Sequence, residues 1–493
     1  MTDADGPRAL RRLPAVGRWL DDPALVRLIE HHGRPAVTDA ARLAIEEARR
    51  SILSGQGTLD PKALLSALSR HLEDRAAPSL TRVLNGTGVV LHTNLGRAPL
   101  SAAAREAVGR AAEGYSNLEM DLESGLRGRR DGHVSSLAAE LVGAEDAFVV
   151  NNCAGATMLM LGALCRGGEV IVSRGELVEI GGGFRVPEIM EESGAQLVEV
   201  GTTNKVYPRD YERAGTAATR AVLSVHRSNF AVVGFTHTPS PQEMVNAARA
   251  LGVPLLVDLG SGLMAEDHAL GRAAATVGAE PRPRDWIRAG ADLVAVSGDK
   301  LMGGPQAGLL AGRAELVERC RRHPLARALR LDKLGLAALE ATLRDYRDGR
   351  AAEVPAVRAM AEPLENVAER AERLRAALLP FFTTADAPKV VPSVSRPGGG
   401  SLPTVELPSR AVVFGPPGGE AERLAARLRS VRPAIVGRML DDRVALDART
   451  LDDAEIPMVA TGIERALSTA TQPPLPSDAP GAFESAAQGG DLG

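Results

Sequence analysis

The chain has 493 residues, of which 44% are hydrophobic and 24% charged, and its formal net charge is −4. This length exceeds what one simple core needs, so we expect two or three domains. Without a basic excess we expect no DNA partner, and any RNA must be held by local patches. No segment reaches the ~18–20 apolar residues of a membrane span.

The cysteines and the N-terminal residues indicate the cellular compartment in which the protein is expected. Cys153, Cys165 and Cys320 form no CxxC pair, and Asp3 and Asp5 stand where a signal peptide would be apolar. Both features favour a reduced, cytoplasmic protein. With no HExxH or CxxC motif, we expect no metal site.

Residues 1–80 are predicted to form a small helical domain. Apolar residues recur at helical spacing through Leu25–Ile29, Leu43–Ile45 and Leu64–Leu68. Pro23 and Pro61 suit the first positions of helices.

Residues 81–345 are predicted to form an α/β domain in which strands alternate with helices. Helices are expected over Pro239–Leu251 and Lys333–Arg347. Such alternation predicts a mostly parallel sheet covered on both faces, with a ligand site at the carboxyl ends of its strands. The expected strands are Ala147–Asn151, Glu169–Val172, Gln196–Val200, Ala221–Val225, Pro254–Asp258 and Asp292–Ser297.

Residues 346–470 are predicted to form a smaller α+β domain, and 471–493 a disordered tail rich in Pro, Ala, Gly and Ser. The expected elements of the small domain are helices near Pro363–Leu378 and Glu420–Arg429 and strands near Val405–Leu407 and Ala411–Phe414.

Two charged residues end neighbouring buried strands. Lys300 follows Leu293–Val296 and precedes Gly303 and Gly304, whose small size would admit a bulky ring; the alternative is a surface lysine. Asp258 ends the strand that begins at Pro254, where a carboxylate is costly without a cation; the alternative is a helix N-cap.

A lysine and an acid in this arrangement suit pyridoxal phosphate (PLP). The lysine would hold the cofactor, and Asp258 would keep the pyridine nitrogen protonated. The phosphate loop is predicted at Asn151, Asn152, Cys153 and Ala154, before a helix expected over Thr157–Leu164. His226, at another strand end, is predicted to contact the ring or its hydroxyl, or else to be a structural histidine.

Longer motifs resemble the bacterial selenocysteine synthases, the L-seryl-tRNA(Sec) selenium transferases, over roughly residues 10–465. The resembling segments are Arg82–Gly88, Leu91–Leu100, Ser173–Gly182, Val200–Asn204, Ser297–Gln306, His323–Lys333 and Gly398–Pro403.

The resemblance implies a fold-type I PLP-transferase that converts seryl-tRNA(Sec) to selenocysteinyl-tRNA(Sec). Water would leave the serine, with Lys300 as the base, and selenium from selenophosphate would add. By match to the family, Arg97, Arg327 and Arg330 would bind selenophosphate, the last two on one helix face. Asp299 would orient the lysine or help the leaving hydroxyl.

The resemblance also implies that the N-terminal domain binds tRNA, and that the chain forms a ring of dimers, which we expect to be a decamer. Two segments depart from the family's pattern. Cys153 stands in a loop that is usually asparagine-rich, and Arg127, Arg129 and Arg130 lie in a loop that would meet tRNA, a neighbouring subunit or solvent.

Two other functions compete with this one. A paralogous PLP lyase acting on a small amino sugar phosphate would lack the N-terminal domain. A non-catalytic RNA-binding scaffold would be free to lose Lys300 or Asp258.

Overall fold

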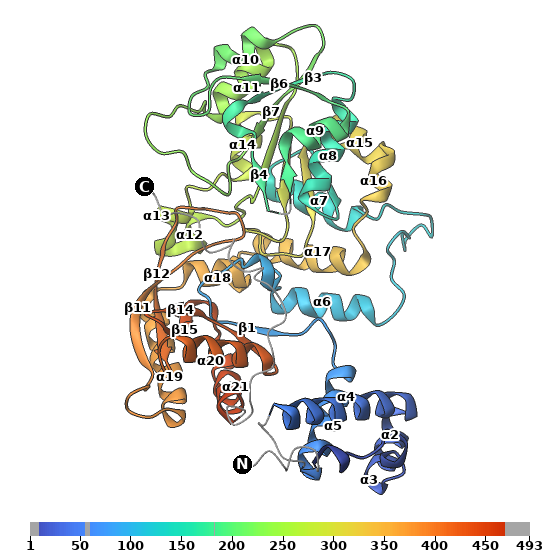
Figure 1. The fold of residues 1–493 in the computed structure, drawn as a ribbon. Helices are drawn as coiled ribbons and strands as arrows, with labels where there is room; N and C mark the ends of the chain where they lie inside the picture. Colours follow the sequence, from blue (N-terminus) through green and yellow to red (C-terminus); the bar gives the residue numbers. More distant parts are fainter. Residues whose placement is uncertain (1–8, 55–59, 182, 469–493) are drawn as a thin grey trace. The chain divides into compact units, whose positions relative to one another are not determined.

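The computed structural model describes residues 9–54, 60–181 and 183–468, so the predicted tail at 471–493 lies outside the described residues. The chain divides into two compact units, Met1–Arg82 with Arg465–Gly493, and Val83–Glu464 (Figure 1). The second unit contains both the α/β and the smaller α+β region; the domain boundaries near 80 and 345 remain predictions.

The described part of the first unit is helical, as predicted. Its helices are α2 (Val16–Trp19), α3 (Pro23–His32), α4 (Arg34–Leu53) and α5 (Pro61–Ala76). Pro23 and Pro61 both begin helices, and the side chains of Asp22 and Asp60 cap them by accepting from the backbone N–H groups of Ala24 and Lys62. Leu25, Val37, Ala41, Leu64 and Leu68 are among the residues that form its core.

A seven-stranded sheet organises the second unit. Its order is β2-β10-β9-β8-β7-β3-β6, in which β9-β8-β7-β3-β6 run parallel and β10 is antiparallel to both of its neighbours. The strands are β2 (Asp146–Val150), β3 (Glu169–Ser173), β6 (Gln196–Val200), β7 (Thr219–Val225), β8 (Leu255–Gly260), β9 (Leu293–Ser297) and β10 (Gly308–Gly312). The mostly parallel sheet is confirmed.

Strand β10 was missed because glycines begin and end it and resemble turn residues. These glycines are needed for close packing: a Cβ at Gly308 would lie 2.1 Å from the Asn152 carbonyl oxygen, and one at Gly312 would lie 2.1 Å from that of Asp292.

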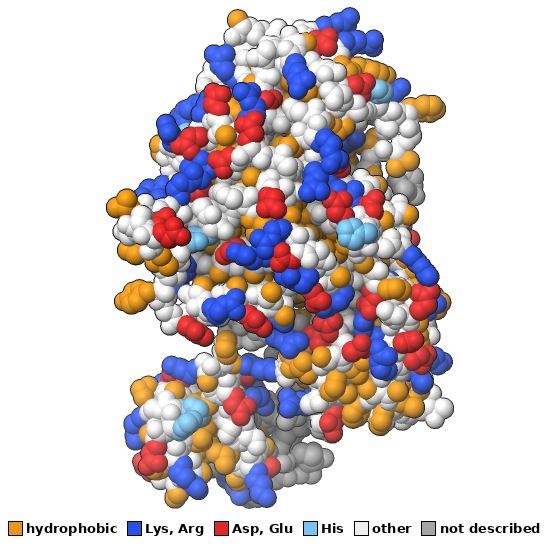
Figure 2. All heavy atoms as spheres, turned by 180° about the vertical axis from the view of Figure 1, so that it is seen from behind, with side chains coloured by type: hydrophobic (Ala, Val, Ile, Leu, Met, Phe, Trp, Pro, Cys, Tyr) orange, Lys and Arg blue, Asp and Glu red, His pale blue; other side chains and the backbone are white. Residues whose placement is uncertain are grey.

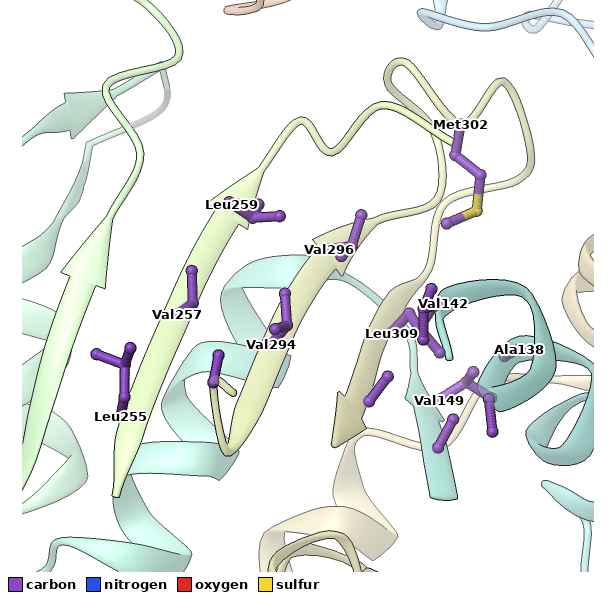
Figure 3. Packing of buried hydrophobic residues seen from close by; sticks show 14 of the residues in the cluster. Ala138, Val142, Val149, Leu255, Val257, Leu259, Val294, Val296, Met302 and Leu309 are labelled. Atoms are coloured by element: carbon purple, nitrogen blue, oxygen red, sulfur yellow. The ribbon is translucent and has the colours of Figure 1, made fainter. Parts of the chain in front are cut away.

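Side-chain alternation along the strands separates two apolar layers. Leu255, Val257 and Leu259 of β8 face the layer with Val294 and Val296 of β9 (Figure 3). Leu256 and Ala295 face the opposite layer. By the same alternation Asp258 lies on the Leu256 side.

Helices cover both faces of this sheet. Residues of α7 (Gly132–Val142), α11 (Pro241–Ala250), α14 (Pro283–Ala289) and α17 (Lys333–Arg347) pack in the first layer, and residues of α8 (Cys153–Leu164), α9 (Val186–Ser193) and α15 (Ala314–Arg322) in the second. Further helices are α6 (Ala102–Ala112), α10 (Pro208–Ala214), α12 (Asp267–Leu270), α13 (Ala274–Val277), α16 (Pro324–Ala328), α18 (Pro355–Ala361) and α21 (Ile456–Ser468).

The smaller region contains an antiparallel sheet, β11 (Lys389–Ser395), β12 (Leu407–Phe414), β15 (Arg443–Asp447) and β14 (Arg438–Leu440), with helices α19 (Leu364–Leu378) and α20 (Gly419–Ser430). The two predicted helices are confirmed. The prediction of separate strands near Val405–Leu407 and Ala411–Phe414 is wrong, since one strand covers Leu407–Phe414. Pro408 in that strand and Pro392 in the unpredicted β11 weaken the strand pattern.

The chain enters the second unit through the smaller region. Strand β1 (Val83–Asn85) pairs in parallel with β13 (Ala434–Val436). The next residues bind the small sheet, because Gly86 O accepts from Asp447 N at 2.8 Å and Leu91 N donates to Pro397 O at 2.8 Å. This attachment fixes the segment that leads to Arg97.

The surface carries mixed charge on the face drawn in Figure 2, where basic and acidic side chains are interspersed. Among the described residues, no helix is long and apolar enough to cross a membrane.

Replacing Asp447 tests which contacts hold the small sheet together. Its carboxylate is buried and accepts from the hydroxyls of Ser393 (2.8 Å), Ser395 (2.9 Å) and Ser409 (2.6 Å), and Arg438 lies 3.2 Å away. Replacing Asp447 by Ala leaves these donors buried without an acceptor. We expect the free energy of unfolding to fall by about 3 kcal/mol.

Urea unfolding measures this loss. The exposed Glu422→Ala is the control and should change stability by less than about 0.5 kcal/mol. An Asp447→Ala variant as stable as this control would show that the carboxylate does not hold the sheet together.

Candidate active site

Lys300 lies in the turn that follows β9, and only 5% of its surface is exposed. Gly303 N donates to Lys300 O at 2.9 Å, and Gly304 N donates to Gly298 O at 2.8 Å, which closes the turn. A Cβ at Gly298 would lie 2.6 Å from Pro305 O, so the turn requires glycine there. Lys300 is therefore a buried lysine on a rigid turn and not a surface lysine.

Asp258 is the buried acid near the end of β8. Its Oδ2 accepts from Thr157 Oγ1 at 2.8 Å, and its Oδ1 accepts from Gly260 N at 2.9 Å. Burial raises the pKa of Asp258 above its usual value, and the Thr157 hydroxyl and the Lys300 charge oppose that rise. Because β8 continues to Gly260, the side chain does not cap a helix. A bound cation would lower the cost of this buried charge.

The lysine and the acid meet at one edge of the sheet. Strands β8 and β9 are parallel neighbours, with Asp258 opposite Ala295. A Cβ built on Gly260 would lie 3.9 Å from both Asp258 Oδ1 and Lys300 Nζ, and 4.0 Å from Ser228 Oγ. The space in front of Gly260 is therefore lined by an amine, a carboxylate and a hydroxyl.

The predicted phosphate loop forms the N-terminus of helix α8. This helix begins at Cys153 and not at Thr157, so Cys153 and Ala154 belong to its first turn. Asn152 caps the helix, its Oδ1 accepting from Gly155 N at 2.7 Å, and Asn151 N donates to Leu329 O at 2.8 Å. The positive end of the helix dipole is thus directed to the strand edge that carries Asp258.

Cys153 contacts the acid directly. Its Sγ lies 3.8 Å from Asp258 Oδ1, within reach of a sulfur hydrogen bond. Burial, reinforced by the adjacent Asp258, raises the pKa of the Cys153 thiol well above its usual value. The side chain therefore stays a neutral thiol that can donate to the carboxylate.

His226 and Ser228 complete this edge. His226 N donates to Asp258 O at 2.8 Å, and Ser228 N donates to His226 O at 2.9 Å. Within the described part of the chain, the buried Ser228 Oγ has no hydrogen-bond partner. Amine, acid, helix N-terminus and an unpaired buried hydroxyl together fit the amine-reactive aldehyde, the pyridine ring and the phosphate of PLP.

Arg97 is brought to the lysine from far away in the sequence. Its Nη1 donates to Asp299 Oδ2 at 2.8 Å, and Ser297 Oγ donates to Asp299 Oδ1 at 2.7 Å. Arg97 adopts a left-handed backbone with φ of 61°, a conformation that costs about 1 kcal/mol or more for a residue with a side chain. Asp299 thus holds Ser297 and Arg97 beside Lys300.

Arg327 and Arg330 line a second feature, a cavity of about 430 Å³. Only Arg327 lies on a helix, α16, because this helix ends at Ala328; the expectation of one helix face is wrong. Arg330 Nη1 lies 3.8 Å from Glu119 Oε1. Leu329, between the two arginines, receives the Asn151 hydrogen bond and so fixes this cavity next to helix α8.

The arginine loop is tied to acids of the same chain. Arg127 and Arg130 pair with Glu119 at 2.6 Å and 3.0 Å, and Arg129 pairs with Asp131 at 2.7 Å. All three line the same cavity as Arg327 and Arg330. The structure thus adds basic side chains to this cavity that motif spacing did not place there.

Three neighbours of the site were not identified from the sequence. Thr157 binds Asp258, Ser228 presents its hydroxyl to the space in front of Gly260, and Glu280 lies 3.2 Å from His226 Nε2. Ser228 follows His226 by two residues at a strand end, and this position could have marked it. Nothing in the sequence around Glu280 distinguishes it from a surface acid.

Two family models match the chain. One describes the L-seryl-tRNA selenium transferases and covers residues 83–452, and the other describes the selenocysteine synthase N terminal region and covers residues 10–49.

Similar proteins that carry this family's name match the chain over nearly their whole length. The L-seryl-tRNA(Sec) selenium transferase of Geobacter sulfurreducens is 46% identical over 463 residues, which cover 93% of this chain and 99% of that protein. That of Moorella thermoacetica is 46% identical over 464 residues, covering 94% and 97%.

A likeness in fold is also found among solved structures. D-glucosaminate-6-phosphate ammonia-lyase superposes with a TM-score of 0.56 at 21% identity, over 81% of this chain and 99% of that one. At this identity the likeness concerns the fold alone.

Glu176 provides a test of the electrostatics beside the site. It follows β3, and its carboxyl group accepts from Ser224 Oγ at 3.3 Å and Val225 N at 3.2 Å, next to His226. Burial raises the pKa of Glu176 from 4.5 to about 7. The folded state therefore binds this proton more tightly than the unfolded state does. The resulting stability is complete below about pH 4.5 and is lost as the pH rises through about 7.

We expect Glu176→Gln, which cannot ionise, to remove this dependence. Relative to wild type, the variant should gain about 1 to 3 kcal/mol of unfolding free energy between about pH 5 and about pH 8. Denaturant unfolding at several pH values measures the difference, with the exposed Glu192→Gln as control. Parallel pH profiles for Glu176→Gln and wild type would rule out a protonated Glu176.

Proposed function

Because the chain belongs to the L-seryl-tRNA selenium transferase family, we propose that it converts seryl-tRNA(Sec) to selenocysteinyl-tRNA(Sec) with bound PLP, taking selenium from selenophosphate. The observation that carries this proposal is the buried Lys300 beside the buried Asp258, in a chain that matches the family in both its N-terminal and its main part.

PLP, when bound, supplies an electron sink for the charge left at the serine α-carbon. Asp258 would hold the proton on the pyridine nitrogen, and Thr157 would keep the carboxylate turned towards it. Asn151, Asn152, Cys153 and Ala154, at the start of α8, would bind the phosphate, with His226 at the ring. The fixed helix N-terminus supports this assignment.

Lys300 would hold the cofactor and then, as a free amine, take the α-proton of the serine. Its burial supports both roles, since the surrounding protein keeps solvent away from the reacting amine. Asp299, which binds Arg97 and Ser297, would position the lysine turn and help the serine hydroxyl to leave.

Selenophosphate would bind to guanidinium groups. Arg97 lies beside the lysine turn, and Arg327 and Arg330 line the cavity next to α8. Guanidinium forks suit tetrahedral oxyanions. Glu119 lies near Arg330 and neutralises part of its positive charge. When the anion binds, Arg330 would have to leave Glu119 or contact both groups at once.

The remaining parts of the proposal concern assembly and partners. The N-terminal helices would bind tRNA, their match to the family's N-terminal model being the support. The chain would assemble as a ring of dimers, a decamer, in the cytoplasm. The alternative activity on an amino sugar phosphate has only the shared fold in its favour, at 21% identity.

The decisive assay combines the purified protein with PLP, seryl-tRNA(Sec) and selenophosphate, and follows selenocysteinyl-tRNA. Wild type should form product and show the visible absorbance of a lysine-bound cofactor. Lys300→Ala should lose both, because it removes the amine proposed to hold the cofactor. Lys333→Ala, which also removes one lysine side chain, is the control, since the Lys333 amine binds Gly114 O and contacts none of the assigned site residues. Product formation by Lys300→Ala would contradict the assignment.

Arg327→Ala tests the proposed anion site. Loss of a charge-assisted contact to the selenium donor should raise KM for selenophosphate about 10- to 100-fold. The cofactor absorbance and KM for seryl-tRNA should stay close to wild type. Arg423→Ala, on the exposed surface of α20, controls for the loss of one positive charge. An unchanged KM for selenophosphate would exclude Arg327 from that site.

A further inference from the structure

Glu280 is a buried acid that the proposed chemistry does not use. It follows helix α13, its backbone N–H donates to Val277 O at 3.1 Å, and only 4% of its surface is exposed. A carboxylate at this depth is costly unless donors or a cation compensate it. Its neighbours therefore indicate its role.

Two side chains at the edge of the site lie next to the same carboxylate oxygen of Glu280. Ser261, the residue after Gly260, donates its hydroxyl to Oε1. The Nε2 atom of His226 lies 3.2 Å from the same oxygen, without the alignment of a full hydrogen bond. A small rotation of the imidazole ring would convert this contact into a hydrogen bond.

His226 connects this acid to the cofactor space. Its backbone N–H is bound to the carbonyl of Asp258, on the strand next to β7. Its Nε2 atom is buried, whereas 26% of the side chain is exposed, so the accessible surface lies on other atoms of the side chain. The imidazole thus has its buried Nε2 edge next to Glu280 and another edge that is open.

We propose that Glu280 is a positioning residue for the reaction, acting through His226. Its Oε1, held by Ser261, accepts a hydrogen bond from the Nε2–H of the imidazole and so selects one tautomer and one ring orientation. Nδ1 then carries the lone pair, and the open edge of His226 accepts hydrogen bonds. This inference rests on the proposed function, in which His226 lies at the cofactor ring.

A purely structural acid would behave differently. It would lower stability when removed, and its effect on activity would be independent of His226. A positioning acid loses its effect once the imidazole is gone, so the two substitutions become non-additive. It also changes the absorbance of the bound cofactor, which reports the hydrogen bonds around the ring.

The experiment uses the full chain loaded with PLP and compares Glu280→Gln, His226→Gln and the double variant. Glu280→Gln should shift the absorbance maximum of the bound cofactor and lower kcat about 10-fold, with KM for seryl-tRNA within about 2-fold of wild type. In the His226→Gln background, Glu280→Gln should cause no further loss. Glu266→Gln, an exposed acid paired with Arg284, is the matched control and should change neither readout.

Equal losses of kcat in both backgrounds, or an unchanged absorbance in Glu280→Gln, would overturn the proposal. If Glu280→Gln does not fold, Ser261→Ala replaces it, because it removes the donor that holds Oε1 and keeps the charge. It should shift the absorbance in the same direction, and an unchanged spectrum would count against the proposal.

The proposed function and the role of Glu280 can be contradicted by different results. The absorbance arm needs no tRNA, so wild type that makes no selenocysteinyl-tRNA while Glu280→Gln still shifts the spectrum would overturn the proposed function alone. Normal product formation with a Glu280→Gln variant indistinguishable from wild type would overturn the role of Glu280 alone.

Discussion

The cost of burying the Asp258 carboxylate is the constraint on which the site depends. Thr157 and Gly260 satisfy its oxygens, and Lys300 places a positive charge near it, yet burial still raises its pKa. A pyridinium nitrogen would relieve this cost by supplying a cation in the space before Gly260. If Asp258 pairs with the ring as proposed, bound PLP would stabilise the fold as well as complete the site.

Much of the surrounding architecture serves to keep that acid and the lysine in register. The parallel pairing of β8 and β9 sets their separation, while alternation along β8 puts Asp258 on the face of helix α8. Gly308 lets β10 pass close to Asn152, which fixes the start of α8. The attachment of residues 86–91 to the small sheet in turn delivers Arg97 to Asp299.

The parts of this site that could be predicted from the sequence are those carried by short local patterns. Lys300 and Asp258 stood out because each charge ends an apolar strand, and the alternation of strands and helices placed them on one edge. Glu280 and Thr157 could not be identified in this way, since their importance arises from contacts 54 residues away with His226 and 101 residues away with Asp258. Strand β10 was not predicted because its glycines resemble turn residues, although close packing requires them there. Arg330 was placed on a helix because the end of α16 depends on tertiary packing and not on a local pattern.

The central claim is that Lys300 holds the cofactor, and trapping that bond tests it most directly. The chain has five lysines, Lys62, Lys205, Lys300, Lys333 and Lys389, of which Lys300 alone is buried. Borohydride reduction of the PLP-loaded protein makes an imine bond permanent, and peptide mass mapping locates it. The account predicts a single phosphopyridoxyl group on the peptide that contains Lys300. The same group on another lysine, or on none, would contradict it.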